Sequence, residues 1–226
     1  MRAALLLAVA FFALAPAAEA RWRPSAVVRH GVRLDRNGLI DRRLLRAALK
    51  SLKAHRGQVA NRRRIAVADL ARPSDQPRFY VLNLRDGSVR LVVTTHGKGS
   101  DPDQTGRAVR VSNTIGSLAS STGAYVTGEA YDSPAHLSRA VRLDGLDPTD
   151  SNARCRCIVI HQANRSDGHG QTGRSDGCFA FSGEDYPYVL GRMVPGTFIY
   201  AGPANLPQWT PDPAPSANCC PEAPPA

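Results

Sequence analysis

One stretch of the chain holds a histidine and a cysteine at a spacing that suits covalent acyl transfer. His161 closes an apolar run, a polar loop of thirteen residues follows, and the loop ends at Ser175-Asp176-Gly177-Cys178. A glycine before a thiol lets the backbone bend so that amide N–H groups converge on one point, where they can stabilise an oxyanion. A histidine within reach can accept the thiol proton, and both His161 and His169 are close enough in sequence. The pattern indicates Cys178 as a candidate nucleophile.

The same stretch offers an alternative, a structural metal site. Five side chains are of types that zinc accepts: Cys155, Cys157, His161, His169 and Cys178. A strand over residues 157–161 would align Cys155, Cys157 and Val159 on the face of His161, with these three in the core. Thiols aimed into a core are poor ligands, and the sequence has no Cys-x-x-Cys pair. We therefore expect no metal and no cofactor, and the lack of a G-x-S-x-G motif disfavours a serine nucleophile.

The elements that must position these residues are predicted to be mainly strands. The candidates are 65–70, 79–84, 89–95, 140–143, 157–161 and 197–201. Asp86-Gly87 predicts a hairpin between the second and third of them. Strands do not alternate with long helices, so a doubly wound sheet is disfavoured. The fold class expected is mainly β, a sandwich or barrel, with a short helix after Ser182.

Positive charge is concentrated near the N-terminus. The chain of 226 residues has a net charge of +10, yet residues 21–64 alone hold fourteen Lys or Arg against two Asp. Within them, residues 41–55 predict an amphipathic helix with a basic outer face. That face is either simply solvated or contacts anionic envelope polymers or a membrane surface. No helix-turn-helix, zinc-finger or RNP pattern is present, so we expect no nucleic-acid partner.

The two ends have the composition of segments outside the folded domain. Arg2 precedes the apolar run Ala3–Ala15, and Ala18-Glu19-Ala20 supplies small residues at a cleavage site. These features predict a signal peptide over 1–20, cleavage after Ala20, and export to the periplasm or cell envelope. The run is too short for a stable membrane span, which needs roughly 20 residues. The remaining chain divides into a basic helical segment (21–63), a catalytic domain (64–202) and a Pro-rich, extended or disordered tail (203–226).

Further motifs appear in an order found in a known family. They are Phe79–Leu84 (FYVLNL), Thr95–Ser100 (THGKGS), Val111–Asn113 with Gly116-Ser117, Ser120–Tyr125 (SSTGAY), Arg142–Leu146 (RLDGL) and Gly173–Ser175 (GRS). Together with His161 and Ser175–Cys178 they resemble the L,D-transpeptidase (YkuD-like) catalytic domain, and within it the murein L,D-transpeptidase subgroup. The resemblance covers roughly residues 65–202, and implies the fold of that family.

The resemblance also implies a mechanism on peptidoglycan stem peptides. Cys178 would be the nucleophile and His161 the general base, with Gly177 and Cys178 N–H groups as oxyanion donors and Ser175 in a positioning role. The thiolate would attack the third residue of a stem tetrapeptide and expel D-alanine, and carbapenems would acylate the same thiol. An amine of a second stem or water would then accept the acyl group. Arg174 would bind a substrate carboxylate or form a structural ion pair, and His96 would line the cleft or close a turn.

Three positions depart from the family pattern. Asp176 stands where many relatives have histidine, Gln162 where many have glycine, and Phe179-Ala180 where Pro-Ala is common. A carboxylate beside a cysteine raises the thiol pKa, so Asp176 is assigned to positioning or surface. Two alternatives stay open: an L,D-carboxypeptidase using the same site, and an inactive module that binds the cell wall.

Overall fold

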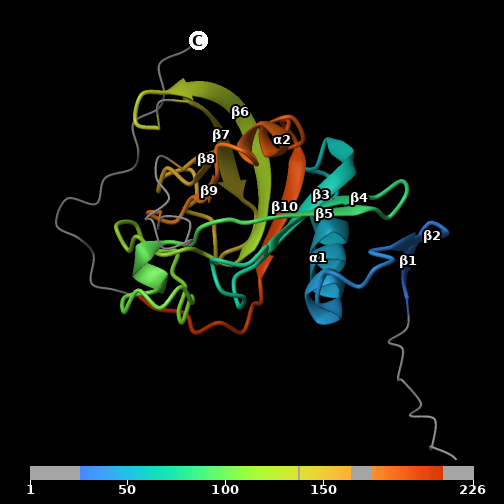
Figure 1. The fold of residues 1–226 in the computed structure, drawn as a ribbon, viewed down its shortest axis with the longest axis horizontal. Helices are drawn as coiled ribbons and strands as arrows, with labels where there is room; N and C mark the ends of the chain where they lie inside the picture. Colours follow the sequence, from blue (N-terminus) through green and yellow to red (C-terminus); the bar gives the residue numbers. More distant parts are fainter. Residues whose placement is uncertain (1–25, 137, 164–174, 211–226) are drawn as a thin grey trace, which may run out of the picture.

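The computed structural model describes residues 26–136, 138–163 and 175–210, so the predicted signal peptide, His169 and Arg174 lie outside the described residues. Its centre is one eight-stranded sheet in the order β5-β4-β3-β10-β6-β7-β8-β9 (Figure 1). The strands are β3 (Asn61–Asp69), β4 (Phe79–Asn83), β5 (Val89–Val92), β6 (Gly123–Ser133), β7 (Ser138–Gly145), β8 (Val159–Gln162), β9 (Phe179–Phe181) and β10 (Thr197–Gly202). The described chain adds a hairpin, β1 (Val27–Arg29) and β2 (Val32–Leu34), and three helices, α1 (Arg42–Ala54), η1 (Lys98–Ser100) and α2 (Tyr186–Leu190).

The sheet curls until its two edges nearly meet. β3 pairs with β10, and β8 with β9, in parallel, while the other neighbours are antiparallel. Beyond β5 the chain continues beside β9, where the Thr95 amide donates to the Ala180 carbonyl at 3.2 Å and the Ser175 amide donates to the His96 carbonyl at 3.1 Å. This closure confirms the predicted mainly β, barrel-like fold.

Two apolar clusters hold the sheet. One fills the inside of the curl and includes Phe79, whose ring meets Phe181 edge-on at 4.9 Å. The other lies between the sheet and α1 and includes Leu45, Val67 and Tyr80. Each fully buried side chain of this size contributes about 1.5–3 kcal/mol, which fixes the strands beneath the site.

Helix α1 confirms the predicted amphipathic helix. Asp41 is its N-cap and accepts hydrogen bonds from the amides of Arg43 and Leu44 at 2.8 and 2.9 Å. The buried face is Leu44, Leu45, Ala48 and Leu52, which packs on β3, β6 and β10. Arg43, Arg46, Lys50 and Lys53 on the other face of the helix are exposed.

The predicted strand 89–95 ends at Val92, and the predicted strand 140–143 is longer, over Ser138–Gly145; three further differences bear on the site and the tail. β8 begins at Val159, because residues 151–157 form turns; Cys155 and Cys157 are therefore not on a strand face with His161. β6 was not predicted, since its sequence contains glycine and acidic residues and its pairing with β7 is interrupted by a register shift after Thr127. Residues 203–210 of the predicted tail pack on the domain, where the Val111 amide donates to the Pro207 carbonyl at 2.9 Å.

In the described parts of the chain, no helix combines the length and the apolar character needed to cross a membrane.

Candidate active site

The sheet places His161, in β8, on the same face as Cys178, which directly precedes the neighbouring strand β9. β8 and β9 run in parallel, with His161 opposite Ala180. Cys178 lies two residues before Ala180 and therefore falls on the same sheet face as His161, one strand away. Its side chain packs on Val159, the residue two before His161. The predicted nucleophile and base thus share one end of the sheet.

A bend that only glycine can adopt presents Cys178. Gly177 has φ of +119°, and a Cβ atom there would lie 2.7 Å from the Ala119 carbonyl oxygen and 2.8 Å from the Ile158 side chain. These separations are shorter than van der Waals contact, so any other residue would displace the loop. The prediction that this glycine shapes the turn therefore has a steric basis in the fold.

Hydroxyl groups fix the backbone of the same turn. Ser175 Oγ donates to the Cys178 carbonyl at 2.7 Å and accepts from the Gly177 amide at 3.2 Å. Thr95 Oγ1 donates to the same carbonyl at 3.1 Å. The Gly177 amide is thereby occupied, whereas for the Cys178 amide no partner is found within the described residues. Of the two predicted oxyanion donors, the Cys178 amide is the one that remains available.

The Cys178 thiol is held inward in this structure. It is 7% exposed; Sγ accepts from the Val159 amide at 3.5 Å and donates to the Cys157 carbonyl at 3.4 Å. Burial raises the pKa of the thiol to about 11, with Asp176 adding to the rise and the Val159 amide and Arg156 opposing it. The resting sulphur is therefore protonated at neutral pH.

His161 is a neutral base with a defined tautomer. Nδ1 lies 2.8 Å from the Gln162 carbonyl, which can only accept, so Nδ1 carries the proton and Nε2 the lone pair. Burial, and secondly the neighbouring His136, lower the pKa of His161 to about 4. A backbone carbonyl thus orients the imidazole, and Asp176 is not needed for it.

A second histidine, which the sequence analysis missed, covers His161. The ring of His136, from the turn between β6 and β7, stacks on the ring of His161 with centroids 3.6 Å apart and planes at 17°. Burial lowers the pKa of His136 as well. Nothing in the spacing could have revealed this contact, because it depends on the unpredicted strand β6.

The burial of His161 under the ring of His136 predicts the pH at which kcat/KM is lost on the acid side. A protonated imidazole cannot accept the thiol proton, so activity is lost as pH falls through the pKa of His161. We expect the acid limb of kcat/KM near pH 4, and we expect His136→Ala, which uncovers the ring, to move it up by about one to two pH units toward the ordinary value of 6.5.

His136→Phe is the matched control. It keeps an aromatic cover over His161 but has no titratable group, so its acid limb should stay within about half a pH unit of the wild type, because burial is the larger cause of the shift. An acid limb that does not move in His136→Ala would contradict this role of the stack.

Asp176 lies at the surface of the site. Its carboxylate is 63% exposed and pairs with the Lys98 ammonium at 2.9 Å. We expect Asp176→Asn to raise the rate of Cys178 alkylation by iodoacetamide about two- to threefold at pH 8 and low salt, because removing a nearby negative charge lowers the thiol pKa. In 0.5 M salt the two rates should converge. A slower reaction of the variant would mean that the Lys98 pair matters more than the charge.

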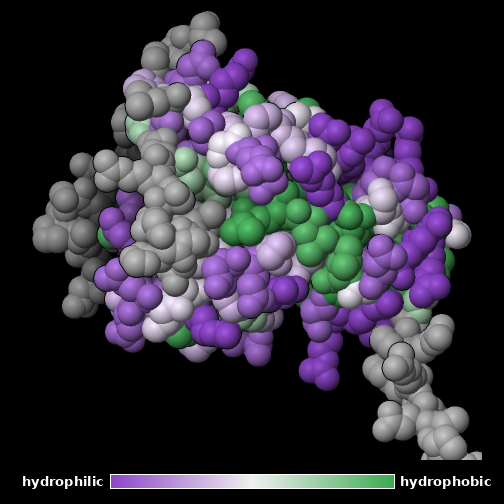
Figure 2. All heavy atoms as spheres, viewed as in Figure 1, coloured by the Kyte–Doolittle hydropathy of each residue, from purple (hydrophilic) through white to green (hydrophobic). Residues whose placement is uncertain are grey.

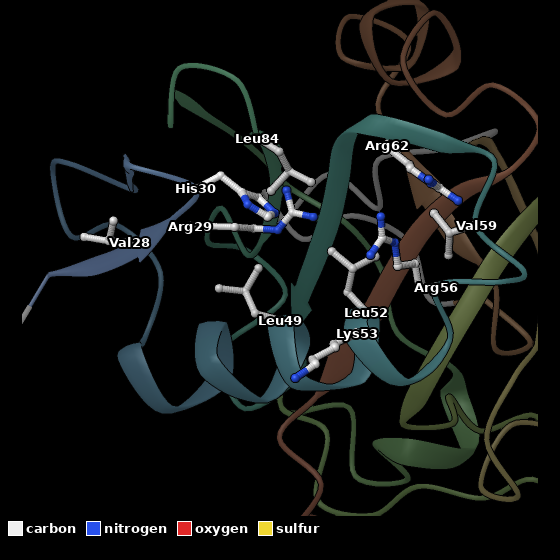
Figure 3. A pocket seen from close by; sticks show the side chains of 10 residues that line it. All are labelled: Val28, Arg29, His30, Leu49, Leu52, Lys53, Arg56, Val59, Arg62 and Leu84. Carbon is white, nitrogen blue, oxygen red and sulfur yellow. The ribbon is translucent and has the colours of Figure 1, made fainter.

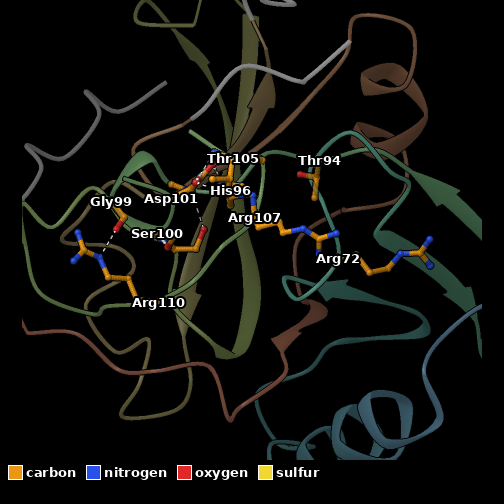
Figure 4. A network of polar contacts seen from close by, with 12 residues as sticks. Arg72, Thr94, His96, Gly99, Ser100, Asp101, Thr105, Arg107 and Arg110 are labelled. Atoms are coloured by element: carbon orange, nitrogen blue, oxygen red, sulfur yellow. Dashed lines mark hydrogen bonds and ion pairs between the residues drawn. The ribbon is translucent and has the colours of Figure 1, made fainter. Parts of the chain in front are cut away.

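His96 is buried behind the site instead of facing a cleft. It is 1% exposed; Nδ1 accepts from Arg78 Nη2 at 2.8 Å, and Nε2 lies 3.4 Å from Asp101 Oδ2 (Figure 4). Asp101 in turn accepts from the amides of Thr105 and Gly106 at 2.9 and 2.8 Å. The ring therefore holds the loop that follows β5, and of its two expected roles the closing of a turn fits this geometry.

The state of Cys155 and Cys157 weakens the alternative of a structural metal site. Cys155 and Cys157 are each disulfide-bonded, and Cys178 is the free thiol among the described cysteines. A disulfide sulphur is not a thiolate, so two of the five candidate ligands are removed. Between them, Arg156 donates to the Ser112 carbonyl at 2.8 Å and to Ser121 Oγ at 3.0 Å, and supports the loop beneath Gly177. Arg156 is a second supporting residue that the sequence analysis missed.

The family described as "L,D-transpeptidase catalytic domain" matches residues 36–201, most of the chain including α1. The protein belongs to this family. No curated protein sequence matches it.

Solved structures similar to this member of the L,D-transpeptidase catalytic domain family are distant. An L,D-transpeptidase from Mycobacterium smegmatis is 15% identical with a TM-score of 0.40 and covers 62% of this chain and 59% of its own. An L,D-transpeptidase from Mycobacterium tuberculosis H37Rv is 17% identical, with a TM-score of 0.38 and coverage of 62% and 58%. L,D-transpeptidase 3 from M. tuberculosis, with a faropenem-derived adduct, is 15% identical, with a TM-score of 0.38 and coverage of 62% and 60%. The chain thus spans about three fifths of the length of these structures.

Proposed function

We propose that the protein is a peptidoglycan L,D-transpeptidase that acts by cysteine acyl transfer. The observation that carries the proposal is the position of a free thiol, Cys178, on the same sheet face as the His161 imidazole. Nδ1 of this imidazole is anchored to the Gln162 carbonyl, and its Nε2 is free to accept a proton. Membership in the family supports peptide stems of peptidoglycan as the substrate class.

The first half-reaction follows from the neutral state of both groups. As substrate enters, rotation of the Cys178 side chain moves Sγ from the Cys157 carbonyl toward Nε2 of His161, which takes the thiol proton. The thiolate attacks the carbonyl of the third stem residue, and the Cys178 amide donates to the resulting oxyanion. His161 then returns the proton to the departing D-alanine amine, leaving a thioester on Cys178.

The second half-reaction decides between transferase and hydrolase. An acceptor amine loses a proton to His161 as it attacks the thioester. The C–S bond then breaks as the new amide bond forms, and His161 returns the proton to the Cys178 thiolate. Water is present at about 55 M, so an amine wins only if the site orients it, and oriented groups reach effective molarities of 10⁵ M or more. We propose transfer to an amine as the main outcome and hydrolysis as the side reaction.

Incubation of the purified protein with disaccharide-tetrapeptide, followed by mass analysis of the products, tests this function. We expect crosslinked dimers that lack one D-alanine, with some tripeptide. Tripeptide alone at all substrate concentrations would make the protein an L,D-carboxypeptidase. Unchanged substrate together with binding to cell-wall sacculi would favour the inactive wall-binding module.

The proposed substrate requires that the protein leave the cytoplasm. The predicted signal peptide supports export to the periplasm or cell envelope, with cleavage after Ala20. N-terminal sequencing of the protein from the envelope fraction should begin at Arg21 or within a few residues of it. A protein that retains Met1 in the cytoplasm would contradict this location.

A further inference from the structure

A pocket at the edge of the layer between α1 and the sheet has no part in the proposed chemistry. It has a volume of about 360 Å³, within the range of small-molecule sites, and lies between the β1–β2 hairpin, α1 and the start of β3 (Figure 3). Its apolar part is Val28, Leu49, Leu52, Val59 and Leu84. Most of these side chains belong to the apolar cluster under α1, so the pocket is an open edge of that cluster.

The rim of this pocket is entirely cationic or neutral. Its polar residues are Arg29, His30, Lys53, Arg56 and Arg62, and no carboxylate lines it. The acidic residues near the lining in sequence are committed elsewhere: Asp35 accepts from the Leu39 and Ile40 amides at 2.9 Å, Asp41 caps α1, and Asp86 accepts from the Ser88 amide at 2.8 Å. The rim charge therefore stands uncompensated by neighbouring carboxylates of the described chain.

Apolar surface reaches the outside at this place. Val28 is 60% exposed, the largest exposure among the large apolar side chains of the described residues. In the view of Figure 2, apolar surface runs across the middle of the molecule toward the side that carries α1 and the hairpin, and hydrophilic side chains project around it. The pocket thus combines an apolar interior, an apolar residue at its edge and a basic surround.

We propose that this face docks on a bilayer containing anionic lipids, with one acyl chain entering the pocket and lipid phosphates meeting its rim. Charge alone would suit a soluble polyanion equally well. The apolar interior favours a lipid, because a polyanion has no apolar group to fill it, whereas Val28 can enter the acyl boundary while Lys53 and Arg56 remain at the headgroups. Several cations around one pocket also match an extended anionic surface better than a single anion.

Co-sedimentation of the purified protein with vesicles tests the proposal. We expect binding to vesicles of phosphatidylcholine with 30% phosphatidylglycerol, little binding to pure phosphatidylcholine, and weaker binding as salt rises. The double variant Lys53→Gln/Arg56→Gln should bind the anionic vesicles about 25-fold more weakly, at about fivefold for each cation. Arg107→Gln, an exposed arginine of a distant loop, is the matched control and should bind as the wild type.

The apolar requirement is tested separately. Val28→Asp should weaken vesicle binding about tenfold or more, because a carboxylate cannot enter the acyl boundary. Val109→Asp, at a residue that is 51% exposed outside the pocket, should leave vesicle binding unchanged. Melting temperatures within about 3 °C of the wild type would show that the variants are folded.

Other outcomes would overturn the proposal. If Val28→Asp binds anionic vesicles as strongly as Val109→Asp does, no acyl chain enters the pocket. Binding of sacculi or inorganic polyphosphate, without binding of anionic vesicles, would assign the basic face to a soluble or wall-linked polyanion. Equal binding of the protein to neutral and anionic vesicles would mean that the cationic residues of the rim do not bind lipid phosphates.

Discussion

Cys178→Ala is expected to abolish turnover of disaccharide-tetrapeptide, with a loss of at least about 10⁴-fold that takes the rate below detection. Cys178 is the free thiol among the described cysteines, and no other described cysteine can supply a thiolate while Cys155 and Cys157 stay oxidised. The methyl group of alanine fits the space of the thiol, so the fold should be kept. Mass analysis of the products measures the loss.

A carbapenem provides a second measurement on the same residue. Family membership supports acylation of Cys178, so the wild type should gain the mass of one carbapenem and Cys178→Ala should gain none. His161→Ala should slow both turnover and acylation by about 10²- to 10⁴-fold, since the thiol pKa of about 11 leaves few thiolates at neutral pH. An adduct on another cysteine, or activity in Cys178→Ala, would refute the site.

Much of the candidate site's geometry could be predicted from local sequence patterns. The turn at Gly177 and the strand end at His161 are short-range features, because the types and order of a few neighbouring residues determine them. Helix α1 was predictable for the same reason, since its apolar residues repeat at helical spacing over the whole element. The spacing of apolar residues and the positions of turn residues can be seen in the sequence without knowledge of any tertiary contact.

The parts that were missed depend on contacts between distant segments. His136 meets His161 only because β6 and β7 form a hairpin that pairs with β8, and β6 carries no clear strand pattern. Cys155 and Cys157 alternate as a strand would, yet Cys157 has φ of +56° and ends a turn. His96 has the same neighbours in sequence whether it lines a cleft or closes a loop, and only its partners distinguish the two.

Arg78→Met is expected to destabilise the protein by about 3–5 kcal/mol. Arg78 is fully buried: Nε donates to the Thr94 carbonyl at 2.9 Å, Nη1 to the Arg72 carbonyl at 2.9 Å, and Nη2 to His96 Nδ1 at 2.8 Å. Methionine fills a similar volume but leaves three buried acceptors without a donor. Urea unfolding at pH 7 measures the loss, and Arg78→Lys should recover only part of it, because an ammonium cannot span the three acceptors.

Arg72→Met is the matched control, since Arg72 is half-buried and donates to the exposed Gln76 and to the hydroxyl of the buried Tyr80. Its cost should stay below about 1 kcal/mol. If Arg78→Met also lowered the free energy of unfolding by less than about 1 kcal/mol, the buried hydrogen bonds of Arg78 would add little to stability.

The Arg78 network also bears on catalysis, because it holds the segment that closes the sheet beside the nucleophile. Thr94 and His96, which receive two of its three donors, flank Thr95, and Thr95 Oγ1 donates to the Cys178 carbonyl. Loosening this segment should let the Gly177 turn move, so kcat of Arg78→Met should fall about tenfold or more even where the variant is folded, as a displacement near 1 Å can cost more than that. An Arg78→Met protein that is destabilised yet keeps full kcat would show that Ser175 alone suffices to hold the turn.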